Sequence, residues 1–412
     1  MTASSRLPAM DMLRGCAVLG ILWMNITAFA FPSAVYFNPA AAGQPSAADS
    51  ALWLLGFVAV DGKMRGLFSL LFGASMLLLI DREEMAGRNG ARTQLIRLAW
   101  LLPIGVGHHL LWWGDILMIY AIIGPVALLF VRMEPVALAR SAFLAFLLHF
   151  LLTAAIMTAL HIWSLAATAP GGDPAAGEGY RAFIAQLSDP ADPAISGEYA
   201  IFRGGLWGIV AHNWAEISGR WLWGLLLSAF DTLGFMLLGM AMAKAGFLTG
   251  RWEAAQYRST ARHCFLIGLP PMIALAVWLI GNGFPPLATF GATIAWSFPF
   301  RVPLVVGWAA LILWLWTRHR GSLLVARLAA AGRMTLSNYL GTTLLMTTLF
   351  HGWGFGLFGH VPMAMLPLVV LGGWAVMLAW SAPWLSRFAM GPAEWLWRSL
   401  CRGKMQQIRK SD

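Results

Sequence analysis

The chain has 412 residues, of which 59% are hydrophobic and only 11% are charged, with 22 Trp and 24 Phe. A soluble domain carries about 25% charged residues, because most of its surface faces water. This composition excludes an ordinary soluble domain and predicts a surface that faces hydrocarbon. The net charge of +10 does not indicate nucleic-acid binding, because the basic residues are spread over short segments between apolar runs.

Ten apolar segments are candidates for spanning helices, each of which needs about 20 mostly apolar residues. They lie at 12–31, 65–80, 95–113, 116–131, 141–163, 221–243, 264–281, 301–317, 336–350 and 363–385. We therefore predict an all-α fold, a polytopic membrane helix bundle of about ten transmembrane helices.

Lys and Arg are distributed unequally between the two sets of connections. Cytoplasmic loops of membrane proteins carry an excess of these residues. If the chain starts inside, ten crossings place most of the 28 Lys and Arg on the cytoplasmic side. The external side then holds only Arg181, Arg203, Arg220 and Arg301. We predict both termini in the cytoplasm of a bacterium, with the protein in the inner membrane.

The longest connection, 164–220, is predicted to be external. It begins with the Pro/Gly/Ala stretch APGGDPAAGEG, which is typical of a flexible linker. Amphipathic segments follow, with tryptophans suited to a membrane interface. We expect a helical cap that separates an amino-terminal membrane half, 1–163, from a carboxy-terminal half, 221–412, with five helices in each and a basic tail.

Ionisable groups inside membrane segments are costly and are therefore functional candidates. Asp231 lies about midway along its segment, where an interhelix ion pair and a site role both remain open. Asp61 and Arg65 are four residues apart on one helix face, with Lys63 between them. Anchoring of these charges at the outer interface is the alternative to a binding site. The glycines that bracket them favour a helix break that points backbone groups into a cavity.

The segment RLAWLLPIGVGHHLLWWGDILMIYAI contains His108, His109 and Asp115. In a straight helix His108 and Asp115 are too far apart for a direct bond, but a turn at Gly114 would fold the carboxylate back. A histidine with a carboxylate partner is the usual general-base arrangement. Adjacent helical residues point about 100° apart, so we expect only one histidine to face a site. A buried structural histidine is the alternative for either one.

Other polar residues carry weaker signals. Asn25 is the strongly polar residue in the outer half of the first helix, and His351 flanks the external Gly-rich turn HGWGFGLFGH. Asp11 and Arg14 could form a local ion pair or contact a cytosolic phosphate. The three cysteines have no zinc or disulfide spacing, and no P-loop, GxSxG, HExxH or Rossmann motif occurs in the sequence. We expect no metal.

Several strings taken together resemble one family. RLPAMDMLRGCAVLGILWMNI, GKMRGLFSLLFGASM and HHLLWWGDILMIYAIIG resemble the amino-terminal half of the YeiB-type family, which carries domain of unknown function 418. GRMTLSNYL and FAMGPAEWLWRSL resemble its carboxy-terminal half. That family is grouped with transmembrane acyltransferases, so the resemblance implies a membrane enzyme that moves an acyl group from cytosolic acyl-CoA to an acceptor on the other side.

The resemblance also implies roles. The Arg14–Gly15 pair and Asn25 match the first-helix pattern of the heparan-glucosaminide acetyltransferase branch. That branch has its catalytic histidine shortly after this helix, whereas YFNPAAAG contains none. The expected base is therefore His108 or His109, oriented by Asp115, with Asn25 binding the acyl carbonyl oxygen.

The other expected contacts divide between donor and acceptor. The phosphates of CoA are expected at Arg14, Arg97 and Arg333. Binding of a sugar, lipid or glycan acceptor is expected at Asp61, Lys63, Arg65, Asp231, Asn338 and His351. The remaining partners are membrane lipids, with a homodimer as a further option and no nucleic acid. The alternative function is a transporter or flippase of a small molecule or lipid-linked product, which the membrane charges would serve equally well.

Overall fold

The computed structural model describes residues 7–410, and helices build this range, where extended segments pair only at an isolated bridge between Phe388 and Arg409. The short elements η1 and η5 are 3-10 helices, and η2, η3 and η4 are π-helices. The elements are, in chain order, α1 (Pro8–Ala30), α2 (Ser33–Phe37), η1 (Pro39–Ala42), α3 (Ala47–Leu55), η2 (Gly56–Val60), α4 (Lys63–Met85), α5 (Gly90–Leu111), α6 (Leu117–Leu128), α7 (Pro135–Thr168), α8 (Pro174–Ser188), α9 (Pro193–Phe202), α10 (Leu206–Ala215), η3 (Ile217–Trp221), α11 (Leu222–Lys244), α12 (Ala254–Gly281), α13 (Pro286–Gly291), η4 (Ala292–Trp296), α14 (Phe298–His319), α15 (Leu323–Arg333), α16 (Thr335–Phe350), η5 (Met363–Met365), α17 (Leu366–Arg387) and α18 (Pro392–Arg402).

Within residues 7–410, seven helical stretches are long and apolar enough to cross a membrane. They contain α1, α4, α7, α11, α12, α14 and α17. The other three predicted spans correspond to α5, α6 and α16. Of these, α6 has 12 residues and α16 has 16, which is short for a span. The predicted all-α polytopic bundle is therefore confirmed, and the number of ten crossings stays a prediction.

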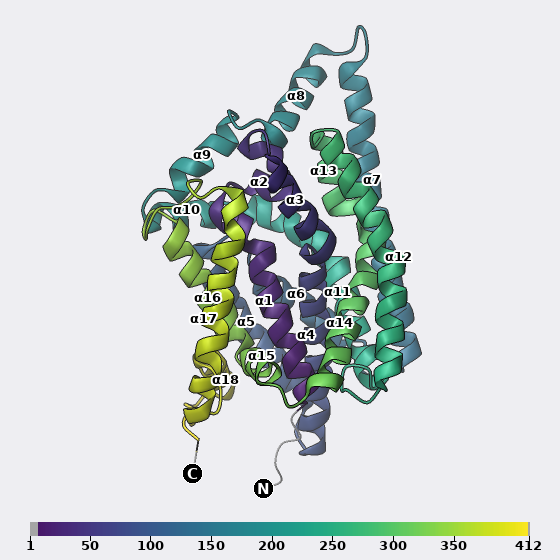
Figure 1. Ribbon diagram of the computed structural model, residues 1–412, viewed down its shortest axis with the longest axis vertical. Coiled ribbons are helices and arrows are strands. Elements are labelled where there is room, and N and C mark those ends of the chain that lie inside the picture. Colours follow the sequence, from purple (N-terminus) through teal and green to yellow (C-terminus); the bar gives the residue numbers. More distant parts are fainter. Residues whose placement is uncertain (1–6, 411–412) are drawn as a thin grey trace.

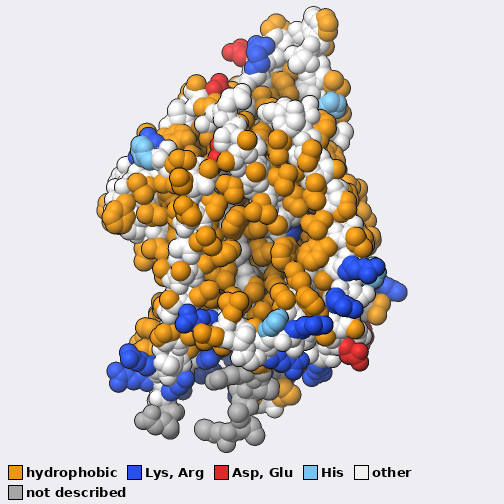
Figure 2. All heavy atoms as spheres, in the orientation of Figure 1, with side chains coloured by type: hydrophobic (Ala, Val, Ile, Leu, Met, Phe, Trp, Pro, Cys, Tyr) orange, Lys and Arg blue, Asp and Glu red, His pale blue; other side chains and the backbone are white. Residues whose placement is uncertain are grey.

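The two ends of the bundle differ in charge. Both chain termini lie at the same end, together with α15 and α18, whereas α8, α9 and α10 lie at the opposite end (Figure 1). Lys and Arg side chains gather at the end that holds the termini, and apolar side chains cover the middle of the molecule (Figure 2). We call these the basic end and the cap end. Termini at one end are what an even number of crossings produces.

The long connection after α7 folds into the helices α8, α9 and α10 at the cap end (Figure 1). Glu198 of α9 ties this cap to the bundle. Its carboxylate accepts hydrogen bonds from the backbone N–H and the hydroxyl of Ser33, at 2.6 and 2.8 Å, and from Arg220 at 2.8 Å. A buried carboxylate with several donors fixes the elements that supply those donors. The cap is therefore docked on α2 and η3.

Small residues let α4 and α11 approach each other closely. A Cβ at Gly73 would lie 2.1 Å from the backbone oxygen of Met236, and one at Gly239 would lie 1.9 Å from that of Leu70. Each glycine therefore fits only because it has no side chain, which is the small-residue packing common between membrane helices. This close approach sets the spacing of the two helices that carry Arg65 and Asp231.

Candidate functional site

The end of α5 brings a histidine and an aspartate together. The helix ends at Leu111, Trp112 has an extended backbone, and α6 begins at Leu117. Across this turn, Oδ2 of Asp115 lies 2.6 Å from Nδ1 of His108. The other oxygen of Asp115 accepts a hydrogen bond from the backbone N–H of Met118 at 2.7 Å, at the start of α6. The carboxylate is therefore held between the imidazole ring and the first turn of the next helix.

A threonine from a distant helix completes the arrangement. The hydroxyl oxygen of Thr343 in α16 lies 2.8 Å from Nε2 of His108. Because an ionised carboxylate can only accept, Nδ1–H of His108 donates to Asp115, and Nε2 is left as an acceptor. The Thr343 hydroxyl then donates to Nε2. We call this the Thr343–His108–Asp115 relay, and all three residues are buried.

The relay opens on a small cavity between α1 and α16. Its walls carry Asn25 and Thr343 as polar groups, together with Val18, Ile21, Leu22, Phe29, Tyr339 and Thr342. The ring of Tyr339 packs 4.8 Å from the ring of His108, and within residues 7–410 its buried hydroxyl has no hydrogen-bond partner. Buried polar groups are normally bonded, so a partly unsatisfied cavity marks a place for a polar ligand or water. Asn25 and the relay thus border one space.

His109 has a different environment from His108. It is buried, and neither of its ring nitrogens has a hydrogen-bond partner in the described part of the chain. It does not border the cavity that Thr343 lines. Of the two adjacent histidines, His108 is therefore the one with a carboxylate partner and with a hydrogen-bonded neighbour, Thr343, that lines the cavity.

A second buried cluster joins α4 to α11. Arg65 donates two hydrogen bonds to Asp231, at 3.1 Å to Oδ1 and 2.5 Å to Oδ2, and Asp231 is only 2% exposed. Two parallel bonds between a guanidinium and a carboxylate form a strong and geometrically specific pair. Of the two roles considered for Asp231, the interhelix ion pair is present.

The helix break expected around the glycines is present between η2 and α4. Asp61 lies in the turn and accepts a hydrogen bond from the hydroxyl of Tyr36 at 2.8 Å. Lys63 begins α4, is fully buried, and donates to the backbone oxygen of Phe57. Gly62 has a φ of +69°, a conformation that favours glycine. The three charged residues of this segment therefore contact different partners.

Arg301 also belongs to this second cluster, although the sequence pattern assigned it to an external connection. It lies in the first turn of α14 and is 7% exposed. A Cβ at Gly62 would lie 2.6 Å from its guanidinium, so the side chain lies directly over that glycine. Arg301 donates one long hydrogen bond, 3.4 Å, to the backbone oxygen of Ile294. The Nε of Arg301 has no partner among the described residues. The contact with Ile294 comes from η4, which the sequence pattern could not indicate.

A cavity of about 100 Å³ lies beside the second cluster. Its polar wall includes Tyr36 and Asp61, and its apolar wall includes Trp23, Trp53 and Phe57. These residues come from α1, α2, α3 and η2, and α17 closes one side. The cavity and the relay therefore use different faces of α1.

The three arginines expected to contact CoA have separate partners. Arg14 forms an ion pair with Asp11 at 3.0 Å and donates to the hydroxyl of Ser75 at 2.7 Å. The guanidinium of Arg97 lies 4.0 Å from the ring centroid of Trp397. Arg333 ends α15, next to α16.

Asn338 and His351 do not border either cavity. The amide of Asn338 donates to the oxygen of Ala331 and to Ser381, and accepts a hydrogen bond from Trp380 at 2.8 Å. These bonds join α15, α16 and α17. His351 is fully buried against aromatic rings, and the ring of Phe202 lies 5.1 Å away. Both residues thus sit in positions that hold helices together.

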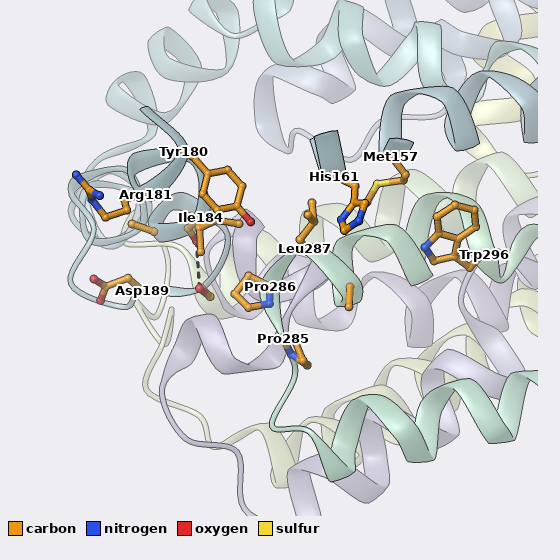
Figure 3. A pocket seen from close by; sticks show the side chains of 13 residues that line it. Met157, His161, Tyr180, Arg181, Ile184, Asp189, Pro285, Pro286, Leu287 and Trp296 are labelled. Carbon is orange, nitrogen blue, oxygen red and sulfur yellow. Dashed lines mark hydrogen bonds between the residues drawn. The ribbon is translucent and has the colours of Figure 1, made fainter. Parts of the chain in front are cut away.

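A larger cavity, about 690 Å³, lies near the cap end between α7, α8 and α13 (Figure 3). Tyr180, Arg181 and Asp189 line it on the α8 side, and Met157, His161 and Trp296 lie across from them (Figure 3). None of the residues that the sequence analysis assigned to catalysis, donor binding or acceptor binding lines this space. Size alone therefore does not mark the candidate site, because this cavity has no buried acid–base pair in its wall.

No grouping of three or more His, Cys, Asp or Glu side chains that could hold a metal ion occurs in the part of the chain that the structure describes. Sequence reasoning missed Thr343, Tyr36, Tyr339 and Arg301. Threonines in membrane helices commonly bond their own backbone, as Thr347 and Thr348 do here, so nothing in the sequence distinguishes Thr343 from its neighbours.

Comparison with known proteins gives related sequences. A family model described as protein of unknown function (DUF418) matches residues 242–404. The chain is 33% identical over 401 residues to the uncharacterized protein YeiB of Escherichia coli strain K12, which covers 95% of each chain. It is 29% identical over 422 residues to the uncharacterized protein YxaH of Bacillus subtilis strain 168, covering 99% of this chain and 97% of that one. No solved structure matches.

Proposed function

The chain belongs to the YeiB and DUF418 family, and from this premise we propose that it is an integral membrane acyltransferase. It would move an acyl group from cytosolic acyl-CoA to a sugar, lipid or glycan acceptor across the membrane. The observation that carries the proposal is the Thr343–His108–Asp115 relay, with 2.8 and 2.6 Å contacts on the two sides of the imidazole ring. An imidazole oriented by a carboxylate is the usual general base of acyl transfer.

The residues around the relay have different roles in the proposed transfer. His108 is the base, because its Nε2 is free to accept a proton while Asp115 holds the ring and stabilises the imidazolium that forms. Asn25 borders the same cavity and supplies a donor for the oxygen of the acyl carbonyl as negative charge develops on it. His109 has no part in the transfer.

The basic end supplies the donor side. Arg14, Arg97 and Arg333 lie on helices that end there, and arginine is well suited to phosphate groups such as those of CoA. The proposal therefore has the basic end in the cytoplasm of a bacterium and the protein in the inner membrane, and the excess of Lys and Arg that cytoplasmic loops carry supports it.

Reporter fusions test this orientation. Fusions after Arg88, Arg258 and Arg327 are expected to report the cytoplasm, and a fusion near Gly172 the exterior. An exterior signal from any of the first three would overturn both the orientation and the ten crossings.

Acceptor binding is assigned to the cavity beside Asp61 and Tyr36, which has aromatic walls from Trp23 and Trp53. Aromatic rings with a few polar groups are the usual lining of small-molecule sites. The acceptor contributes the hydroxyl or amine that receives the acyl group.

Lys63 contacts the wall of this cavity through the backbone oxygen of Phe57. The Arg65–Asp231 pair lies in the same buried cluster without lining the cavity. Because this cavity and the relay use different faces of α1, the acceptor must pass that helix to reach His108.

The activity can be tested on the purified protein in lipid nanodiscs. Acetyl-CoA and palmitoyl-CoA serve as donors, and free CoA is measured by mass spectrometry with water or added sugars as acceptors. The wild-type chain is expected to bind the donor and to release CoA above the enzyme-free rate, whereas His108→Gln should bind the donor and release almost none. If the wild-type chain releases no CoA with either donor, the acyltransferase proposal fails.

One observation favours the alternative, a transporter or flippase. The Arg65–Asp231 pair and the buried Arg301 lie beside a broken helix, and such breaks form substrate and ion sites in transporters. Movement of a fluorescent phospholipid between the leaflets of proteoliposomes distinguishes the two functions. Lipid movement that depends on Asp231, without CoA release, would favour the transporter.

A further inference from the structure

We propose that Thr343 is the nucleophile of the acyl transfer and carries the acyl group as an ester between two half-reactions. This inference rests on the proposed function and deepens it, because it replaces a direct transfer by a covalent relay through the middle of the bundle. The observations that carry it are the direction of the hydrogen bonds, the position of the hydroxyl at the cavity, and its place along α16.

The hydrogen bonds make Thr343 the group that His108 activates. Asp115 accepts from Met118 N–H with one oxygen and from His108 Nδ1–H with the other, so Nε2 of His108 accepts. The only described group at Nε2 is the Thr343 hydroxyl, at 2.8 Å. A hydroxyl bonded to a base that is itself oriented by a third group is the arrangement that activates a weak oxygen nucleophile.

Thr343 borders a small cavity of about 10 Å³, enough for about one water molecule, so the side chains around it must move apart to admit an acyl group. Thr343 lines this cavity from α16, and Asn25 lines it from α1. An acyl carbonyl that enters this space meets a nucleophile on one side and an amide donor on the other, which a tetrahedral intermediate requires. Thr342 lines the same cavity, but within residues 7–410 neither Thr342 nor Thr347 has a recorded hydrogen bond to a histidine. Thr342 contacts the sulfur of Met377, and Thr347 donates to its own helix.

The place of Thr343 along α16 suits a relay between the two sides. The helix begins at Thr335, near the basic end, and Thr343 comes eight residues later, about 12 Å along the axis. A donor held at the basic end therefore needs to extend only its thioester into the bundle. The acceptor approaches from the cap side, so neither CoA nor the acceptor needs to cross the membrane.

The chemistry balances in two steps. In the first, Nε2 of His108 takes the proton of the Thr343 hydroxyl as its oxygen attacks the thioester carbonyl. The C–S bond breaks, a C–O bond forms, and His108 returns the proton to the leaving thiolate, which departs as CoA. In the second, His108 takes a proton from the acceptor hydroxyl, whose oxygen attacks the threonine ester. The ester C–O bond to Thr343 breaks, His108 returns the proton to the threonine oxygen, and the acylated acceptor leaves.

The test is to find the acyl group on the protein. Wild-type protein in nanodiscs is incubated with radiolabelled acetyl-CoA or palmitoyl-CoA without added acceptor, and its peptides are analysed by mass spectrometry. We expect one acyl group on the peptide that contains Thr343, released by hydroxylamine. His108→Gln and Thr343→Ala should carry at least about 100-fold less label, whereas Thr343→Ser should keep it.

Thr348→Ala is the matched control, because Thr348 lies on the same helix and its hydroxyl donates only to the oxygen of Leu344. It should be labelled like the wild-type chain. Label on another residue, or CoA release by Thr343→Ala within about threefold of wild type, would overturn the proposal and leave the acyltransferase standing. No CoA release by the wild-type chain would instead remove the acyltransferase and the relay with it.

Discussion

The two buried polar clusters differ in how their groups are used. In the Arg65–Asp231 pair, a guanidinium and a carboxylate face each other with two hydrogen bonds, so most of the binding capacity of each is taken by the other. In the relay, three groups of different kinds follow one another in a line, and the last hydroxyl borders a cavity. The first arrangement is closed and the second is open at one end.

This difference indicates that the Arg65–Asp231 pair holds two helices together, whereas the relay is suited to a reaction. A closed ion pair between α4 and α11 holds two helices at a fixed spacing, and breaking it leaves a buried charge. An open relay gains nothing in packing from its terminal hydroxyl, but that hydroxyl is presented to a ligand. Burial and charge alone would have ranked the two clusters equally, whereas the direction of the hydrogen bonds distinguishes them.

The largest expected effect concerns the relay. His108→Gln removes the base and should lower the rate of CoA release by about 100- to 10,000-fold, the range a general base contributes. His109→Gln should change the rate little and act mainly on stability, because among the described residues neither ring nitrogen of His109 has a hydrogen-bond partner. The two variants are compared for rate and for expression level. Near-normal rates in both variants, with good expression, would exclude His108 and His109 as the general base and would favour the transporter function.

The second effect concerns the Arg65–Asp231 ion pair. Asp231→Asn leaves Arg65 without its carboxylate, and the loss of stability should be on the order of 3 kcal/mol, as for a broken buried pair. The double variant Arg65→Met/Asp231→Leu removes both charges and should recover much of that loss. Thermal unfolding in detergent measures each variant. If Asp231→Asn unfolds like the wild-type chain but loses transfer or transport, the pair belongs to a site and the comparison above is wrong.

A smaller effect tests whether the clusters are independent. Ser69 in α4 shares a hydrogen bond with the hydroxyl of Tyr120 at 2.8 Å, one turn from Arg65. Ser69→Ala should cost about 1 kcal/mol of stability, the usual worth of one hydrogen bond. It should change the rate of CoA release by less than about twofold. A large rate loss in this variant would mean that the two clusters act together.

The smallest effect uses a partly buried carboxylate outside both clusters as a reference. Glu394 of α18, at the basic end, accepts hydrogen bonds from Ser337 and from the N–H groups that begin α16. Burial raises the pKa of Glu394 above its ordinary value of 4.5. Its native state therefore holds the proton more tightly than the unfolded state, so stability should fall as the pH rises from about 4.5 through the raised pKa.

Glu394→Gln should flatten this part of the pH profile of thermal unfolding, because the titrating group is gone. The change is expected to be the smallest of the four, since three donors already offset the burial of the charge. A pH profile that is identical in both proteins would show that Glu394 does not titrate in this range.

The sequence predicted the pairing of His108 with Asp115 because these two residues are close in the chain. His108 and Asp115 are seven residues apart, and Trp112 to Ile116 form the turn between α5 and α6. A turn of this length brings the carboxylate of Asp115 back toward the end of α5. The contact between His108 and Asp115 therefore follows from local geometry. The all-α class, the cap and the basic end follow in the same way, because they depend on composition and on the order of apolar runs.

Only the tertiary structure decided which distant groups meet. Arg65 and Asp231 are 166 residues apart, and His108 and Thr343 are 235 apart. Each pair depends on which face of one helix lies against which face of another, and that is set by close packing, as where Gly73 meets Met236. In an almost uniformly apolar sequence every helix face resembles the next, so the pattern of residues could name the polar side chains but not their partners.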